Sequence, residues 1–228
     1  MTFSTSLSLN IMLKALIFDF DGLLLDTEMP LVQSWREVFD QYQVPIDAGA
    51  LTHLVEFSRE PSEAYHLLEA RLGAPIDRES LRAARLGREA QLVSEQGPMP
   101  GVESILQVAR VAGLATAIAS SSPLSWIAPQ LARLGLASSF ESIRCSDHVD
   151  RVKPDPDLYL AVLADLGIGS SEAVAFEDSP AGVEAARRAG VACVVVPNPA
   201  TVGLAWGPVK LMVSSLESVT LEQLINLV

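Results

Sequence analysis

The sequence predicts an α/β fold, in which a parallel β-sheet covered by helices on both faces carries an inserted helical segment. Residues 13–18 are almost continuously apolar and are followed by Asp19 and Asp21, as expected for a strand buried on both faces. Residues 29–95 instead have the character of helices. From residue 102 onward, apolar runs alternate with helical stretches, which is the pattern of βαβ units.

Two glycines and two prolines within residues 97–101 mark a boundary between two parts of the chain. Beyond it, the sequence predicts helices at 102–111, 125–134, 156–166 and 181–189, and strands at 114–119, 141–145, 173–176, 191–196 and 211–213. The helical segment before the boundary is too long for a plain loop. We therefore expect one core domain built from residues 12–22 and 98–228, a helical cap domain at 23–97, and a flexible extension at 1–11.

The composition excludes several classes of function. The chain has 228 residues, of which 16 are basic and 28 acidic, so its net charge is −12 and it lacks the basic surface that nucleic acid requires. No stretch approaches the ~18 apolar residues of a membrane span, and the N-terminus does not resemble a secretory leader. Cys145 and Cys193 form no CxxC pair and are expected to be buried thiols. We expect a cytoplasmic protein, either monomer or homodimer.

Polar side chains follow four of the predicted strands, where ligands of parallel α/β sheets bind. These positions hold Asp19 and Asp21, then Ser120, Ser121 and Ser122, then Lys153, and finally Glu177, Asp178 and Ser179. Carboxylates that converge on one edge repel one another unless a cation neutralises them, and oxygen ligands without His or Cys favour Mg²⁺. A lysine and a helix N-terminus can hold phosphate oxygens. Each signal alone is typical of loops and caps, but the ordered set predicts a site for Mg²⁺ and a phosphate group.

Together these motifs resemble the haloacid dehalogenase-like hydrolase superfamily, in the branch with a helical cap inserted after the first strand. The first motif is the run DFDGLLLDTE at residues 19–28, the second is Ser120, the third is Lys153 within KPDP, and the fourth is EDS at residues 177–179. The resemblance covers nearly the whole chain from residue 12. It implies a Rossmann-like core.

The resemblance also implies the chemistry, with Mg²⁺ as cofactor and a small phosphorylated metabolite as substrate. Asp19 would be the nucleophile that forms an aspartyl-phosphate, and Asp21 would be the general acid. A carboxylate suits the first role because it is expected to be ionised at neutral pH. The implied metal ligands are Asp19, the backbone carbonyl of Asp21, Asp178, and Glu177 directly or through water. The implied phosphate-binding residues are Ser120, Ser121 and Lys153.

Differences from other branches of the family limit the reactions that this chain is expected to catalyse. Asp21 argues against dehalogenation, and the lack of any lysine between Lys14 and Lys153 argues against the branch that uses a cap lysine. A phosphomonoesterase for a sugar phosphate or nucleotide is favoured. The alternative is β-phosphoglucomutase. Residues 57–60 resemble the cap motif of that enzyme, although LVE at 54–56 stands where the motif has a lysine and a glycine. A catalytically silent metabolite-binding protein is the third hypothesis, against which the intact motifs count.

Residues of the helical segment give weaker signals. Arg78, Arg82, Arg85 and Arg88 are spaced 4, 3 and 3 apart and are expected to form a solvated helix face rather than an anion-binding funnel. Candidates for substrate specificity are Glu28, near the start of the segment, and Arg59 in its mutase-like setting. Trp35 and Trp126 lie in helical patterns and are expected to be packing residues.

Overall fold

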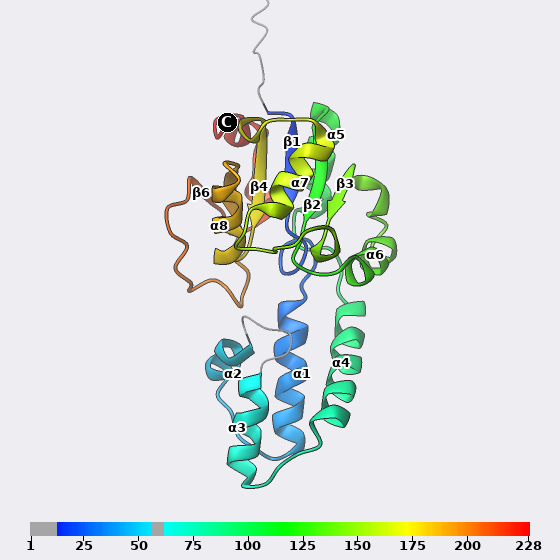
Figure 1. The fold of residues 1–228 in the computed structure, drawn as a ribbon, viewed down its shortest axis with the longest axis vertical. Coiled ribbons are helices and arrows are strands. Elements are labelled where there is room, and N and C mark those ends of the chain that lie inside the picture. The colour runs from blue at the N-terminus through cyan, green and yellow to red at the C-terminus, as the bar shows by residue number, and fades with distance from the viewer. Residues whose placement is uncertain (1–12, 56–61) are drawn as a thin grey trace, which may run out of the picture.

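Within residues 13–55 and 62–228, the part of the chain that the computed structural model describes, six parallel strands form one sheet in the order β3-β2-β1-β4-β5-β6 (Figure 1). The strands are β1 (Ala15–Phe18), β2 (Ala115–Ala119), β3 (Ser142–Arg144), β4 (Ala173–Glu177), β5 (Ala192–Val195) and β6 (Leu211–Met212). The predicted α/β fold is confirmed, and each predicted strand is present with ends that differ by at most two residues. The extension expected at 1–11 lies outside the described residues.

Strand β1 lies in the middle of the sheet because every residue in it is apolar and can be buried on both faces. It pairs with β2 and β4, with Ala15 beside Ala115 on one side and Ala173 on the other. All four residues of β1 are fully buried. On one face of the sheet the rings of Phe18 and Phe176 stack with their centroids 4.9 Å apart.

Helices cover both faces of this sheet. They are α5 (Val102–Ala112), α6 (Leu124–Arg133) and α9 (Leu221–Ile225) on the face of Phe18, and α7 (Asp157–Leu166) and α8 (Pro180–Arg188) on the face of Ile17. Figure 1 shows α7 and α8 in front of the sheet. Short 3₁₀ helices also occur at Ala137–Ser139, Ser146–His148, Ser170–Glu172 and Leu216–Ser218. The sequence had predicted α5 to α8, but not α9 or the 3₁₀ helices.

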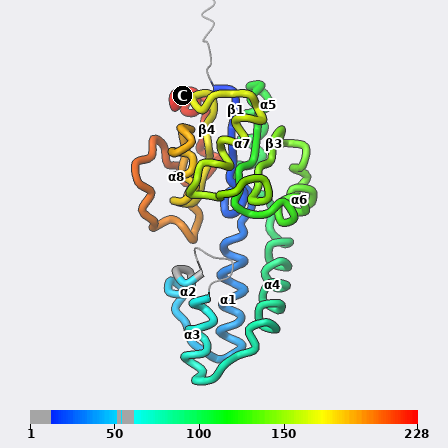
Figure 2. The backbone as a smooth tube through the Cα atoms, viewed as in Figure 1, coloured from blue at the N-terminus to red at the C-terminus, as the bar shows by residue number. Residues whose placement is uncertain are grey.

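The inserted segment forms a helical bundle beyond the carboxyl ends of the strands (Figures 1 and 2). Its helices are α1 (Glu28–Gln41), α2 (Ala48–Val55), α3 (Ser62–Leu72) and α4 (Arg78–Ser94). The bundle has an apolar core of its own, around the fully buried Trp35 and Phe39. Trp35 packs edge-on against Tyr65 with ring centroids 4.9 Å apart, so its predicted packing role is confirmed.

The two chain segments that join the bundle to the sheet are hydrogen-bonded to each other. Leu25, on the way in, forms an antiparallel bridge with Pro98, on the way out. The backbone N–H of Met99 donates to the carbonyl of Leu24 at 3.0 Å. From the core side, the guanidinium of Arg133 donates to the carbonyl of Gln96 at 2.7 Å, just beyond the C-terminal end of α4. The bundle is therefore attached through two adjacent chain segments that are hydrogen-bonded to each other.

The predicted solvated arginine face of α4 is right for Arg82, which is exposed, but wrong for Arg85. Arg85 is only 2% exposed, because α4 packs along α1 and its position faces that helix. Its guanidinium donates to the buried Glu89 at 2.5 Å and lies 5.1 Å from the centroid of the Trp35 ring. The four arginines do share one side of α4, as their spacing predicts, but part of that side is buried inside the bundle.

No helix in the described ranges, 13–55 and 62–228, has both the length and the apolar character needed to cross a bilayer.

Candidate active site

The parallel sheet brings the predicted site residues to one edge. Asp19 directly follows β1, Ser120 directly follows β2, and Glu177 is the last residue of β4. Because β1 lies between β2 and β4, these three strand ends are neighbours. Lys153 reaches them from the connection between β3 and α7, so the edge collects residues that are far apart in the sequence.

Lys153 is buried between two carboxylates. Its side chain is 5% exposed, and its ammonium forms ion pairs with Asp19 and, at 2.6 Å, with Glu177. Burial lowers the pKa of Lys153, but the two carboxylates outweigh that effect and hold the pKa above its usual value. Tyr159 of α7 donates its hydroxyl hydrogen to the fully buried Glu177. Lys153 is therefore a fixed positive charge beside Asp19.

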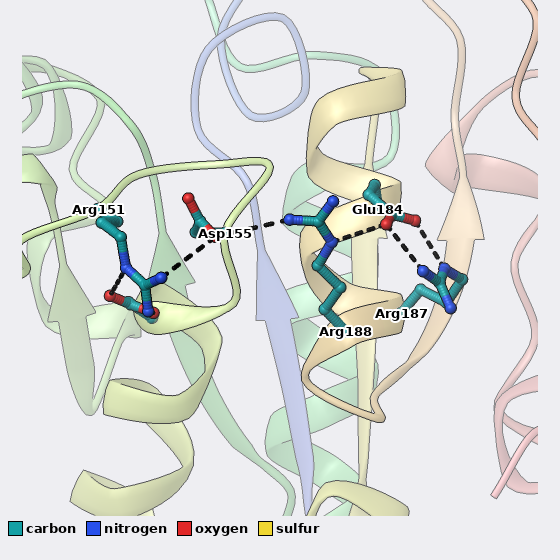
Figure 3. A network of polar contacts seen from close by, with 6 residues as sticks. Arg151, Asp155, Glu184, Arg187 and Arg188 are labelled. Atoms are coloured by element: carbon teal, nitrogen blue, oxygen red, sulfur yellow. Dashed lines mark hydrogen bonds and ion pairs between the residues drawn. The ribbon is translucent and has the colours of Figure 1, made fainter.

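The connection that carries Lys153 is also held from the surface, as Figure 3 shows. Arg151 forms ion pairs with Asp157 at 3.0 Å and with Asp155 at 3.7 Å. Arg188 of α8 approaches Asp155 at 3.5 Å. All these side chains are partly or largely exposed, so each pair contributes little to stability. Their effect is to restrain the loop on both sides of Lys153.

Asp178 is positioned by close approach of the backbone at Gly22. Gly22 has a positive φ of 76°, and a Cβ added there would lie 2.2 Å from Oδ2 of Asp178. The same oxygen accepts a hydrogen bond from Nδ2 of Asn198 at 2.7 Å. The positive φ and the close approach to Asp178 explain why the turn after Asp21 has glycine at this position. Asn198 follows β5 at the same edge of the sheet.

The carboxylates of Asp19, Glu177 and Asp178 are buried together. Each offers an oxygen atom within 4.8 Å of those of the other two. Burial raises the pKa of Asp19 to about 7, helped by Glu177 and Asp21, while Lys153 opposes the shift. Burial likewise raises the pKa of Asp178 well above its usual value. In the metal-free protein a proton therefore competes for the Asp19 carboxylate near neutral pH.

This donor set fits a hard cation. It consists of carboxylate oxygens in a buried cluster, where one lysine cannot balance three or more negative charges. A divalent ion would supply the missing positive charge and keep Asp19 in its ionised form. The cluster could therefore hold a metal ion, as the sequence predicted.

Asp21, the predicted general acid, points to α6 and the turn before it. Its Oδ1 accepts a hydrogen bond from Nε1 of Trp126 at 2.8 Å, and its Oδ2 accepts one from the hydroxyl of Ser122. The ring of Trp126 packs against the apolar core, as predicted. Its contact with Asp21 was not predicted, because helical periodicity does not reveal where an indole N–H points.

The remaining predicted site residues differ in burial and in what they contact. Ser120 is buried, and its Oγ accepts a hydrogen bond from the backbone N–H of Ser122 at 3.1 Å, whereas Ser121 is exposed at the start of the turn. Glu28, in the first turn of α1, is close enough to Asp178 to add to the rise in its pKa. Arg59 lies outside the described residues.

Three residues of this site were missed by the sequence analysis: Trp126, Tyr159 and Asn198. Asn198 could have been found, because it follows the predicted strand at 191–196 and the strand-end rule applies to that strand too. Tyr159 lies in an apolar helical run and gives no signal in the sequence. Its role depends on the packing of α7 on the sheet, which brings the Tyr159 hydroxyl to Glu177 at the end of β4.

Comparisons with known proteins identify relatives of this chain. A family model described as haloacid dehalogenase-like hydrolase matches residues 16–196. The YhcW protein of Bacillus subtilis is 39% identical over 83% of this chain and 86% of its own length. A phosphorylated carbohydrates phosphatase of Thermotoga maritima is 31% identical over 78% of this chain and 82% of its own.

Two further relatives bear on the function and the fold. The β-phosphoglucomutase of Bacillus subtilis is 31% identical over 81% of this chain and 83% of its own. A solved structure from Thermotoga maritima, 28% identical, superposes with a TM-score of 0.78 over 95% of this chain and 100% of that chain. The family match spans most of the chain, and it includes the first, second, third and fourth motifs. The chain therefore belongs to the haloacid dehalogenase-like hydrolase family, as a hydrolase of its capped, phosphatase-type branch.

Proposed function

We propose that this protein is a Mg²⁺-dependent phosphomonoesterase, which acts on a small phosphorylated metabolite through an aspartyl-phosphate intermediate. The observation that carries the proposal is the position of Asp19. It is 7% exposed at the centre of the sheet edge, paired with Lys153 and clustered with Glu177 and Asp178. A buried carboxylate beside a fixed ammonium is suited to attack an anionic phosphoryl group, because the ammonium offsets the repulsion between the two.

In the first step, a carboxylate oxygen of Asp19 attacks phosphorus and forms a new P–O bond. The P–O bond to the substrate's alcohol breaks, and its electron pair goes to the departing oxygen. Asp21 donates a proton to that oxygen, so the alcohol leaves neutral. Lys153, Ser120 and the backbone N–H of Ser121 hold the phosphoryl oxygens in this scheme.

In the second step, water attacks the phosphorus of the aspartyl-phosphate. The Asp21 carboxylate accepts a proton from this water, and the P–O bond to Asp19 breaks with its electron pair returning to Asp19. Inorganic phosphate is released and both aspartates regain their starting protonation states. The helical insertion acts in this proposal as a cap that admits substrate and excludes bulk water.

Mg²⁺ would be held by the side chains of Asp19 and Asp178, by the backbone carbonyl of Asp21, and by Glu177 directly or through water. When bound, it would stabilise negative charge on the transferring phosphoryl group. The fit of a hard cation to the buried carboxylate cluster supports this assignment. Asn198 and Gly22 would keep the Asp178 carboxylate in place for it.

A sugar phosphate is the favoured substrate class, with nucleotides second. Support comes from the relative named as a phosphorylated carbohydrates phosphatase. Glu28 and Arg59, at the junction and in the cap, are the proposed specificity residues. Glu28 can accept hydrogen bonds from sugar hydroxyls, and its position near Asp178 supports a place beside the substrate.

The test is phosphate release from a panel of phosphomonoesters, with Mg²⁺ or with a chelator. The panel contains hexose 6-phosphates, β-glucose 1-phosphate, glycerol phosphates and nucleoside monophosphates. We expect release that depends on Mg²⁺, and a loss of at least about a thousandfold in Asp19→Asn. Asp40→Asn, the same change on an exposed position of α1, is the matched control. Turnover that survives Asp19→Asn or complete removal of divalent metal would contradict the proposal.

Phosphoryl transfer of the β-phosphoglucomutase type is the second candidate, supported by the relative of that name. In that reaction the phosphoryl group returns to a sugar instead of passing to water. Conversion of β-glucose 1-phosphate to glucose 6-phosphate, without release of phosphate, would favour it.

A further inference from the structure

Trp126 lies outside the four motifs, and its indole N–H reaches Asp21, the proposed general acid. It lies in the first turn of α6, which begins at Leu124, and its ring packs against the apolar core. Its Nε1 lies 2.8 Å from Oδ1 of Asp21, a good distance for a hydrogen bond. On the other side of the carboxyl group, Oδ2 of Asp21 meets the hydroxyl of Ser122.

Trp126 and Ser122 offer Asp21 different chemistry. An indole N–H can only donate a hydrogen bond, whereas a serine hydroxyl can donate or accept one. When Asp21 is protonated, its carbonyl oxygen is a stronger acceptor than its hydroxyl oxygen, so the Trp126 N–H favours Oδ1 as the carbonyl oxygen and Oδ2 as the oxygen that carries the proton. There the Ser122 hydroxyl can accept it until a leaving group takes its place.

We propose that Trp126 is a positioning residue for Asp21: its N–H fixes the rotation of the carboxyl group and favours Oδ2 as the oxygen that carries the transferable proton. This inference rests on the proposed function, in which Asp21 is the general acid. Trp126 does not touch the reacting atoms. It acts on the reaction only through Asp21.

Helix α6 is a firm support for this role. Ile127 and Leu131 are buried in the core. The N-terminal end of the helix is held by Asp147, which accepts a hydrogen bond from the backbone N–H of Leu124 at 2.6 Å. The C-terminal end is held by Arg133, which donates to the carbonyl of Gln96. A donor on such a helix keeps its place while the acid is deprotonated and reprotonated.

The test compares substrates that differ in their need for a proton. A sugar phosphate has an alkyl leaving group, which must be protonated as it departs, whereas p-nitrophenyl phosphate releases a stabilised phenolate without one. The parameter is kcat/KM, because it covers the steps up to release of the alcohol and excludes breakdown of the aspartyl-phosphate. In Trp126→Phe we expect kcat/KM for the sugar phosphate to fall about tenfold or more, and kcat/KM for p-nitrophenyl phosphate to fall far less.

A purely structural role for Trp126 predicts a different result. If the ring serves only for packing, both substrates lose activity by the same factor, or neither does, and either outcome overturns the inference. Ser125→Ala, an exposed neighbour in the same turn, is the matched control for changes in α6. Should Trp126→Phe fail to fold, benzothienylalanine at position 126 keeps the bicyclic shape and replaces only the N–H by sulfur.

Asp21→Asn separates failure of this inference from failure of the proposed function. If Asp21→Asn leaves the ratio of the two kcat/KM values unchanged, Asp21 is not the acid and the proposed function fails at that step. If Asp21→Asn changes the ratio and Trp126→Phe does not, the assignment of Trp126 alone is wrong.

Discussion

The stability of the metal-free protein should depend on pH through Asp19. In the unfolded chain this carboxyl group has its ordinary pKa of 3.8, whereas burial raises the pKa to about 7 in the folded protein. Between these two values the folded protein holds a proton that the unfolded chain has released. The free energy of unfolding therefore falls as the pH rises, and the contribution of Asp19 to this fall is about 4 kcal/mol.

The perturbation that tests this effect is Asp19→Asn, which has nearly the same shape but cannot ionise, and which also removes the Asp19 charge that adds to the rise in the pKa of Asp178. Urea unfolding in the presence of a chelator, at several values between about pH 4 and pH 8, would give the free energy of unfolding of both proteins. We expect wild type to lose about 4 kcal/mol relative to the variant across this range. Parallel pH profiles for the two proteins would refute the reasoning.

Mg²⁺ provides the complementary measurement. A cation that binds only the folded state stabilises it by RT ln(1 + [Mg²⁺]/Kd). Since protons compete with it for Asp19 and Asp178, Mg²⁺ should raise the unfolding midpoint of wild type more at about pH 8 than at about pH 5. An equal effect at both values would mean that these carboxylates do not bind the ion.

Three further predictions concern other parts of the molecule. Arg85→Met should lower the free energy of unfolding by about 3–5 kcal/mol, because it leaves Glu89 buried without its cation, and the added change Glu89→Leu should restore much of this loss in urea unfolding. Gly22→Ala should abolish Mg²⁺ binding, measured by calorimetry, because the new Cβ collides with Asp178, whereas Gly87→Ala, in open space within α4, should be neutral or slightly stabilising. Arg188→Ala should change the free energy of unfolding by less than about 1 kcal/mol, because its ion pairs are exposed. A larger change in urea unfolding would mean that the network of Figure 3 contributes more to stability than exposed ion pairs usually do.

The fold and the centre of the site could be predicted from the sequence for one physical reason. A strand buried on both faces needs a nearly continuous apolar run, and such runs are easily recognised, as at residues 13–18. Once the strands are known, the residue that follows each one is known too. Parallel strands bring those residues to one edge, which is why Asp19 and Glu177 were expected to meet.

The residues that were missed depend on contacts between elements far apart in the sequence. Whether Arg85 faces solvent or α1 depends on how two cap helices pack, and their spacing alone does not determine it. Trp126 and Tyr159 lie within helical patterns whose apolar character fully explains them as core residues. Their polar atoms reach Asp21 and Glu177 only because α6 and α7 lie over particular strand ends.

The bridge between Leu25 and Pro98 has a consequence for how this protein can diversify. Because the two connections leave the core side by side, the gap that would remain if the insertion were removed is no wider than a hairpin turn can close. The sheet and the edge that carries the candidate site therefore do not require one particular insertion between Leu25 and Pro98. Helices of a different length or sequence can occupy that position without disturbing Asp19 or Lys153, so substrate preference can change by exchange of a whole module while the chemistry stays the same.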